Sequence, residues 1–277
     1  MGRLQDRTAL ITGGTTGLGL AIAERYLLEG ARVVITGRDP AIGDAAQRRL
    51  RDGGEAWFVA ADAANAADVR RSLERAVEVL GGLDVLVNNA GIGVAATVLD
   101  TPVEDFDRVM GVNVRGPYLY AREAFESLRE RGGCMIHMSS DAGVLGEHEI
   151  GVYSISKAAV TMLSNMLALE CAPHGVRSNA ICPGDIEPGM RHMAPPGQED
   201  GQEDPAEWFV PPVGRIGRAA DVAGAAVYLA GPDATFVNGI TLLVDGGMRA
   251  GYRAGRSPAS PDGGRSSEAP EAPQAHG

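Results

Sequence analysis

The stretch TALITGGTTGLG, residues 8–19, joins a short apolar run to three closely spaced glycines. Gly13, Gly17 and Gly19 allow a tight turn and a close approach of the backbone to a ligand. A helix that begins near Gly17 directs its N-terminal amides at a phosphate. The spacing is G-x-x-x-G-x-G, which differs from the G-x-G-x-x-G of the common dinucleotide fingerprint. Its position between a predicted strand and a predicted helix favours a nucleotide-binding turn.

The rest of the chain repeats this alternation of short apolar runs and longer stretches with helical periodicity. The runs predict strands at 8–12, 32–36, 56–60, 83–88, 134–138, 176–181 and 240–244. Helices are expected at 18–28, after 36 through 50, at 68–80, from about 104 to 130, and from near 153. Such alternation is typical of a parallel sheet covered on both faces. We therefore predict an α/β fold, a single doubly wound Rossmann-type domain with a seven-stranded parallel sheet, over residues 1–250.

Two segments interrupt this pattern. Residues 188–212 contain six prolines and five acidic residues. An irregular stretch of this length is usually a lid or a disordered insertion, and we predict a substrate lid. Residues 251–277 consist largely of Gly, Ala, Pro and Ser and contain no Ile, Leu, Val, Phe or Met. Because such a segment cannot bury apolar surface, we expect a disordered tail.

Composition excludes several classes of protein. The formal net charge of −11 argues against binding to nucleic acid or to anionic membranes. The N-terminus lacks the apolar region of a signal peptide, and no run of 18 apolar residues is present, so no transmembrane helix is expected. Cys134, Cys171 and Cys182 show no CxxC spacing and are expected to be reduced core residues of a cytoplasmic protein.

The stretch IGVYSISK, residues 150–157, places Tyr153 and Lys157 one helical turn apart on one face. A free tyrosine has a pKa of about 10, and a nearby cation lowers that value. We therefore expect Lys157 to lower the pKa of Tyr153, which then exchanges a proton with an alcohol or ketone while hydride moves to or from a nicotinamide. Ser140 ends the strand CMIHMSS on the same rim and can hold the substrate oxygen.

Taken together, these motifs resemble the short-chain dehydrogenase/reductase family, in its classical subfamily, over nearly all of the chain except the tail. The matching features are the glycine turn from Thr12 to Gly19, NNAG at 88–91, Asn113 in MGVNVRG, Ser140 thirteen residues before Tyr153, the Tyr153-x-x-x-Lys157 pair, CPG at 182–184 and DGG at 245–247. They occur in the order and at the spacings of the family.

The resemblance implies an NAD(P)-dependent oxidoreductase that interconverts a secondary alcohol and a ketone, with Ser140, Tyr153, Lys157 and Asn113 as its catalytic residues. It also implies that Lys157 bonds the nicotinamide ribose and that Asn113 holds a water linking Lys157 to solvent. The predicted cofactor contacts are Thr12, Gly13, Gly17, Leu18, Gly19, Arg38, Asp62, Ala63, Asn89, Ala90, Gly91, Tyr153, Lys157, Pro183, Gly184 and Ile186. No metal is expected.

The resemblance further implies a homotetramer or homodimer, with the closing strand and DGG at a subunit interface. The competing hypothesis is a catalytically inactive NAD(P)-binding sensor on the same fold, which need not keep all four catalytic residues. A nucleotide-sugar epimerase or dehydratase would usually be longer and have a different glycine turn, and a divergent enoyl reductase would separate Tyr and Lys by more residues. The sequence leaves the particular ketone or alcohol open.

Several residues have two interpretations. Ser139 neighbours Ser140, and the spacing to Tyr153 favours Ser140 as the catalytic serine. Asn88 and Asn89 either bond adjacent strands or contact the cofactor. His137 lies on an apolar strand and is interpreted as a core or interface residue.

Two further positions bear on the substrate and cofactor pockets. The GEHE stretch at 146–149 is either a solvated loop or a pocket lining that favours a polar or basic substrate. Pro188 stands where the family often has a threonine that contacts the nicotinamide amide, and proline offers neither a hydroxyl nor an N–H. After the predicted strand at 56–60, the family's usual Asp-Val pair is Asp62-Ala63 in this sequence. Asp62 can still accept a hydrogen bond from the adenine amino group.

The cofactor is predicted to be NADP(H) rather than NAD(H). An acid at the end of the second strand accepts bonds from the adenosine ribose and repels a 2′-phosphate. Here that position is Gly37, followed by Arg38, whose guanidinium can bind a phosphate through two parallel hydrogen bonds. Asp39 is only one residue beyond Arg38, and a one-residue shift of the alignment would bring it toward the ribose, which leaves NAD as the alternative cofactor.

Overall fold

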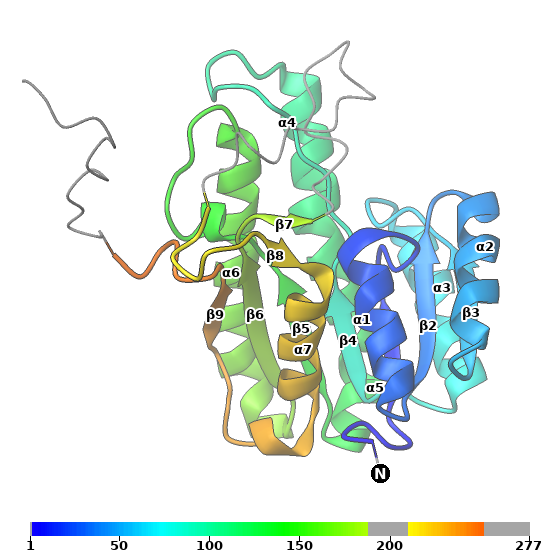
Figure 1. Ribbon diagram of the computed structural model, residues 1–277. Helices are drawn as coiled ribbons and strands as arrows, with labels where there is room; N and C mark the ends of the chain where they lie inside the picture. The colour runs from blue at the N-terminus through cyan, green and yellow to red at the C-terminus, as the bar shows by residue number, and fades with distance from the viewer. Residues whose placement is uncertain (1, 188–209, 252–277) are drawn as a thin grey trace, which may run out of the picture.

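The computed structural model describes residues 2–187 and 210–251, and seven of its strands form one twisted parallel sheet (Figure 1). The strands, in chain order, are β1 (Thr8–Ile11), β2 (Arg32–Gly37), β3 (Ala56–Ala60), β4 (Val85–Asn88), β5 (Cys134–Met138), β6 (Arg177–Pro183) and β9 (Thr241–Val244). They lie in the order β3-β2-β1-β4-β5-β6-β9, and every pair is parallel. The order reverses between β1 and β4, where a doubly wound sheet opens a crevice at the carboxyl ends of its strands. The predicted fold class is confirmed.

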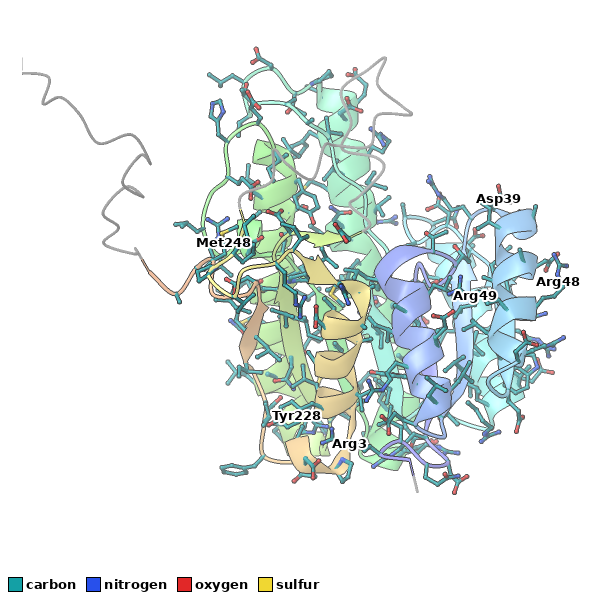
Figure 2. All side chains as sticks on the ribbon, in the orientation of Figure 1. Arg3, Asp39, Arg48, Arg49, Tyr228 and Met248 are labelled. Atoms are coloured by element: carbon teal, nitrogen blue, oxygen red, sulfur yellow. The ribbon has the colours of Figure 1, made fainter. Side chains whose placement is uncertain are left out.

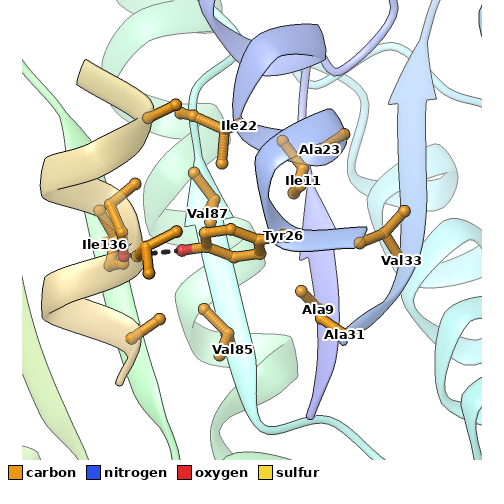
Figure 3. Packing of buried hydrophobic residues seen from close by; sticks show 14 of the residues in the cluster. Ala9, Ile11, Ile22, Ala23, Tyr26, Ala31, Val33, Val85, Val87 and Ile136 are labelled. Atoms are coloured by element: carbon orange, nitrogen blue, oxygen red, sulfur yellow. Dashed lines mark hydrogen bonds between the residues drawn. The ribbon is translucent and has the colours of Figure 1, made fainter. Parts of the chain in front are cut away.

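Helices cover both faces of the sheet (Figure 1). One face carries α1 (Gly17–Leu28), α2 (Pro40–Arg51) and α7 (Ala219–Ala230), and the other carries α3 (Ala66–Leu80), α5 (Gly116–Arg131) and α6 (Gly151–Cys171). Figure 3 shows Tyr26 of α1 buried against β1 and β4, with its hydroxyl donating to the carbonyl of Ala226 on α7 at 3.0 Å. This bond satisfies the one polar group that the ring brings into an otherwise apolar layer.

Local sequence accounts for where two of these helices begin. Asp39 caps α2 by accepting from the amides of Ala41 and Ile42, and Pro40 occupies the first helical position, where its missing N–H is harmless. Asn65 caps α3 in the same way. The cap at Asp39 matters for the site, because it engages that carboxylate at the edge of the crevice.

The single helix expected from about residue 104 to 130 is wrong in detail. The structure has α4 (Val103–Met110), a π-helical segment η1 (Gly111–Arg115) and then α5. A π-helical turn inserts one extra residue, which apolar periodicity does not reveal, and such turns are frequent at functional sites. Asn113 lies in this segment.

Further short elements lie around the carboxyl rim and in the connections. They are β7 (Ile186–Glu187), β8 (Gly217–Arg218), and the 3₁₀ turns η2 (Asp141–Gly143), η3 (Ala172–His174) and η5 (Pro232–Ala234). The predicted substrate lid lies almost entirely outside the described residues, and the predicted tail lies outside them from residue 252 onward.

Helix α6 and the turn after it, Gly151–His174, are long and apolar enough to cross a membrane by length and composition alone, with a mean hydropathy of 1.2. Helices in the core of a globular protein can be equally long and apolar. In this fold α6 packs on β5 and β6 and carries Tyr153 and Lys157 on its buried side. We therefore interpret α6 as a core helix of the α/β domain.

Candidate active site

A cavity of about 1700 Å³ opens along the carboxyl ends of the strands, on both sides of the point where their order reverses. Ligand pockets usually measure about 300–1,000 Å³, so this one has room for a dinucleotide together with a substrate. Most of the predicted residues line it, namely Gly13, Gly17, Leu18, Arg38, Asp62, Ala63, Asn89, Ala90, Gly91, Ser140, Tyr153, Lys157, Pro183, Gly184 and Ile186. Three predicted residues, Thr12, Gly19 and Asn113, are not in its lining.

The glycine turn is packed too closely for side chains. Gly13 has φ +61°, and a Cβ there would lie 2.8 Å from the Cα of Ala90. At Gly19 a Cβ would collide with the carbonyl of Gly13, which explains a glycine that does not line the cavity. Gly17, at the first position of α1, has φ +53° and open space beside it. The turn therefore presents bare backbone and a helix N-terminus to the cavity, which fits a pyrophosphate.

Thr12 and Asn89 hold this turn from behind. The Thr12 hydroxyl accepts from the amides of Asn89 and Ala90, each at 3.0 Å. The Asn89 side-chain amide donates to the carbonyls of Thr12 and Gly13, each at 3.0 Å. These bonds tie the end of β1 to the end of β4. Asn88 is buried and donates to the Pro117 carbonyl at 3.3 Å, so both asparagines make structural bonds while Asn89 also lines the cavity.

At the far end of the cavity, the residues after β2 are arranged around Gly37. A Cβ at Gly37 would lie 2.7 Å from the Thr15 methyl group, so an acidic side chain at this position requires Thr15 to move. The Arg38 side chain is exposed, lines the cavity and has no hydrogen bond or ion pair among the described residues. The Asp39 carboxylate, in contrast, is engaged as the α2 cap, through Oδ1. A free guanidinium beside a residue without a carboxylate suits a phosphate group.

The predicted catalytic side chains meet at the other end. Tyr153 and Lys157 rise from the first two turns of α6, and Ser140 follows β5. The Ser140 hydroxyl is within hydrogen-bond reach of the Tyr153 phenol. Lys157 Nζ lies 5.5 Å from the centre of the Tyr153 ring and donates to the Met138 carbonyl at 2.9 Å. All three side chains are at least nine-tenths buried.

The expected lowering of the Tyr153 pKa is wrong for the protein chain alone. The pKa of Tyr153 is raised to about 12, chiefly by burial; the hydrogen bond from Ser140 lowers it, and the carboxylates of Asp141 and Glu147 contribute to the rise. Burial also lowers the pKa of Lys157 to about 8. The spacing on the helix correctly placed the ammonium near the ring, but desolvation, which the spacing does not describe, outweighs that charge.

Asn113 acts on the backbone around this site. Its side-chain oxygen accepts from the Ile92 amide at 2.8 Å, and its amide donates to the Ile92 carbonyl at 2.8 Å and to the Ser156 hydroxyl at 2.9 Å. The π-helical segment is thereby attached both to the loop after β4 and to α6. The water-holding role implied for Asn113 stays a prediction.

The remaining alternatives have structural answers. The Ser139 hydroxyl donates to the Lys157 carbonyl at 2.8 Å and bonds Thr161, so it fixes α6 rather than facing Tyr153. His137 is fully buried, as expected of a core residue, and its pKa is lowered to about 4 by burial. Glu147, His148 and Glu149 line the cavity mouth and are also exposed, which combines both interpretations of the GEHE loop. Pro188 lies outside the described residues.

Sequence reasoning missed two acids in the cavity wall. Asp141 follows Ser140 directly, and Asp185 follows the CPG motif. Each lies one residue beyond a predicted site residue at the carboxyl end of a strand, a position at which a charged side chain faces the cavity. No group of three or more His, Cys, Asp or Glu residues suited to a metal ion occurs in the described part of the chain.

Comparison with known proteins identifies the family of this chain. A family model described as "Enoyl-(Acyl carrier protein) reductase" matches residues 13–249. The chain belongs to the short-chain dehydrogenase/reductase family. It is 35% identical to an NADP-dependent (R)-specific alcohol dehydrogenase of Lentilactobacillus kefiri, over 90% of this chain and 98% of that protein.

Other relatives carry related names. A 2-(R)-hydroxypropyl-CoM dehydrogenase of Xanthobacter autotrophicus is 38% identical, over 88% of this chain and 99% of that protein. Among solved structures, levodione reductase superposes with a TM-score of 0.83 at 31% identity, covering 90% of this chain and all of that one. These relatives are dehydrogenases and reductases, and the chain is accordingly an oxidoreductase that acts on secondary alcohols or ketones.

Proposed function

We propose that this protein reduces a ketone with NADPH, or oxidises the corresponding secondary alcohol with NADP⁺, using Tyr153 as the general acid and base. The observation that carries the proposal is the convergence of Ser140, Tyr153 and Lys157 at one end of a cavity whose other end is the glycine turn. The relatives named as alcohol and hydroxypropyl-CoM dehydrogenases match this chain over nearly their whole length, which supports the same class of activity.

In this proposal the cofactor, when bound, supplies or accepts the hydride at its nicotinamide ring. Ser140 directs its hydroxyl at the substrate oxygen and stabilises the charge that develops there. Tyr153 donates its proton to that oxygen during reduction and takes it back during oxidation. Lys157 lies close enough to the phenol to stabilise its anionic form, and the fully buried setting strengthens that attraction.

The preference for NADP(H) is argued from Arg38. It is an exposed cation at the cavity wall with no partner in the described part of the chain, while Asp39 is engaged at the start of α2. The relative from Lentilactobacillus kefiri is named as NADP-dependent, which supports the same choice.

The acids at the mouth of the cavity favour a neutral or basic substrate over an anionic one. Glu147, Glu149 and Asp185 line that end, and burial raises the pKa of Glu147, as do the charges of Asp141 and Asp185. A negatively charged substrate would be repelled by these carboxylates. Comparing an aminoketone, a neutral ketone and a ketoacid of matched size tests this preference.

A homotetramer or homodimer is also proposed, in a cytoplasmic location. Helix α6 exposes Ile155, Met162, Met166 and Leu169, between 44% and 71% of each, in a stripe on the side away from the sheet. Among the described residues, strand β9 is an edge of the sheet and pairs with β6 alone. Exposed apolar stripes and open strand edges are typical of surfaces that bind another chain.

The alternatives are weaker. An inactive sensor need not gather a serine, a tyrosine and a lysine in one pocket, and no relative supports it. An enoyl reductase, the description of the family model, reduces a carbon–carbon double bond. The four-residue spacing from Tyr153 to Lys157 favours carbonyl chemistry over the divergent enoyl reductases.

The decisive test is Tyr153→Phe, which keeps the ring and removes the proton-transfer group. Turnover of ketones should fall by more than about 10²-fold, while NADPH affinity stays within about threefold, because the phenol acts on the proton rather than on the nucleotide. Tyr228→Phe on α7, far from the cavity, is the matched control (Figure 2). Retention of more than a tenth of the wild-type rate by Tyr153→Phe would refute the assignment.

A further inference from the structure

Asp141 is a buried carboxylate beside the predicted catalytic serine. It is 8% exposed, lines the cavity and begins the 3₁₀ turn η2. Its Oδ1 accepts from the Ala142 amide at 2.9 Å and from the Ser140 hydroxyl at 3.2 Å. Ser140 has only one proton to donate, so Asp141 competes for it with the Tyr153 phenolate and the substrate oxygen.

The other carboxylate oxygen of Asp141 is held by Arg249, which comes from the chain after β9. Arg249 Nε donates to Asp141 Oδ2 at 3.2 Å, and its Nη2 reaches Glu147 Oε2 at 3.4 Å. The Arg249 side chain is only 17% exposed, so this ion pair is largely shielded from solvent. One guanidinium thereby binds two of the carboxylates that line the Tyr153 end of the cavity.

The turn that carries Arg249 is itself fixed. Asp245 is buried and accepts from the amides of Gly247 at 2.9 Å and Arg249 at 2.8 Å. A Cβ at Gly184 would lie 3.0 Å from the Cβ of Asp245 and 3.6 Å from Asp141 Oδ2. The glycine after Pro183 thus lets this turn approach Asp141, and Arg249 reaches the site from a rigid support.

We propose that Arg249 is a positioning residue for the Ser140–Tyr153 pair, which it serves by binding Asp141 and leaving the Ser140 hydroxyl free to turn toward Tyr153 and the substrate oxygen. The proposal rests on the function proposed above. It assigns a role to the segment after the DGG motif, which the mechanism does not otherwise use.

Charge balance around Tyr153 supports this role. The groups that face it are Asp141 of η2, Glu147 of the following loop, Cys182 of β6 and Lys157 of its own helix. Both carboxylates raise the pKa of Tyr153, and Arg249 is the cation paired with each of them. Without Arg249, the full charge of Asp141 acts on the phenol, and its carboxylate accepts more strongly from Ser140.

The test compares Arg249→Met, Arg249→Lys, Asp141→Asn and the double variant Arg249→Met/Asp141→Asn. For alcohol oxidation with NADP⁺, Arg249→Met should lower kcat about tenfold near neutral pH and shift the rising limb of the kcat–pH profile upward by about one unit. Arg249→Lys should lose less kcat than Arg249→Met, because it keeps the charge but not the two directed bonds of the guanidinium. The double variant should recover most of the loss, because the side chain that accepts from Ser140 then carries no charge and Glu147 alone of the two carboxylates is left without Arg249.

Arg75→Met is the matched control, since it removes a guanidinium from an exposed ion pair with Glu78. Melting temperatures verify that each variant is folded. A kcat loss in Arg249→Met without a shift of the profile would mean a merely structural role and overturn the proposal. Equal impairment of Arg249→Met and the double variant would also overturn it, because the Asp141 charge would then not be the route of action.

A readout without turnover separates this inference from the proposed function. NMR of tyrosine labelled with ¹³C at Cζ, with the Tyr153 signal assigned by its loss in Tyr153→Phe, reports the ionisation of that phenol. Titration of the NADP⁺ complex should show a higher pKa for Tyr153 in Arg249→Met than in wild type. The pKa in the double variant should be lower than in Arg249→Met. Wild-type protein inactive on every ketone and alcohol would refute the proposed function, whereas an unchanged NMR titration would refute the role of Arg249.

Discussion

Substitution of Arg38 by aspartate should reverse the preference between the two nicotinamide cofactors. Arg38 is exposed at the cavity wall and has no bond to another described residue, so its replacement removes no internal interaction. A charge-assisted hydrogen bond to the adenosine phosphate is worth about 1.5–3 kcal/mol. At about 1.4 kcal/mol per tenfold change, the loss corresponds to about 10- to 150-fold in kcat/KM for NADPH.

The new carboxylate adds repulsion of the phosphate and can accept from both ribose hydroxyls of NADH. We therefore expect Arg38→Asp to raise kcat/KM for NADH while it lowers the value for NADPH. The equivalent change at Gly37 is a poorer test, because a side chain there would press on Thr15. Arg48→Asp, an equal change of charge on the exposed face of α2, is the control and should leave the ratio unchanged (Figure 2).

The assay is steady-state kinetics of one ketone with each cofactor, together with NADPH binding followed by its fluorescence. A ratio of the two kcat/KM values that changes less than about threefold in Arg38→Asp would refute the phosphate contact. A wild-type protein that prefers NADH would refute the proposed cofactor and would assign the ribose contact to Asp39 instead.

Three further outcomes are expected. His137 binds a proton less readily when folded, with a pKa of about 4 against 6.5, so the free energy of unfolding should fall by about 3 kcal/mol as the pH drops from 6.5 to 4. His137→Asn should flatten this slope in urea titrations, and an unchanged slope would contradict it. Burial lowers the pKa of Lys157 from 10.5 to about 8, so the folded protein holds this proton at a cost. Lys157→Met should be inactive, but below pH 8 its free energy of unfolding should exceed that of wild type by about 2 kcal/mol, a value that allows for the lost hydrogen bond to Met138. This gain should vanish as the pH rises from 8 to 10.5. Equal or lower stability at pH 7 would argue against a buried ammonium. Met162→Lys/Met166→Lys should reduce the assembly mass measured by light scattering, whereas Leu28→Lys, on exposed α1, should not; an unchanged mass would exclude the α6 stripe as an interface.

Much of the architecture follows from local sequence. Buried strands appear in the sequence as continuous apolar runs, and closely spaced glycines between a strand and a helix indicate a tight turn. The sheet, the nucleotide crevice and the Tyr153–Lys157 spacing were therefore predictable. The π-helical turn around Asn113 was not, because it changes the helix by one residue without altering the apolar pattern.

Tertiary structure decided the electrostatics of the site. Spacing brings Lys157 toward Tyr153, but only the depth of burial determines that desolvation raises the pKa of the phenol and lowers that of the ammonium. The meeting of Asp141 with Arg249, residues 108 positions apart, depends on the order of the strands and on a glycine at 184. Periodicity and motifs record which residues are neighbours along one element. Charges from different elements combine only after the sheet has assembled, and their energies depend on how completely the fold excludes water.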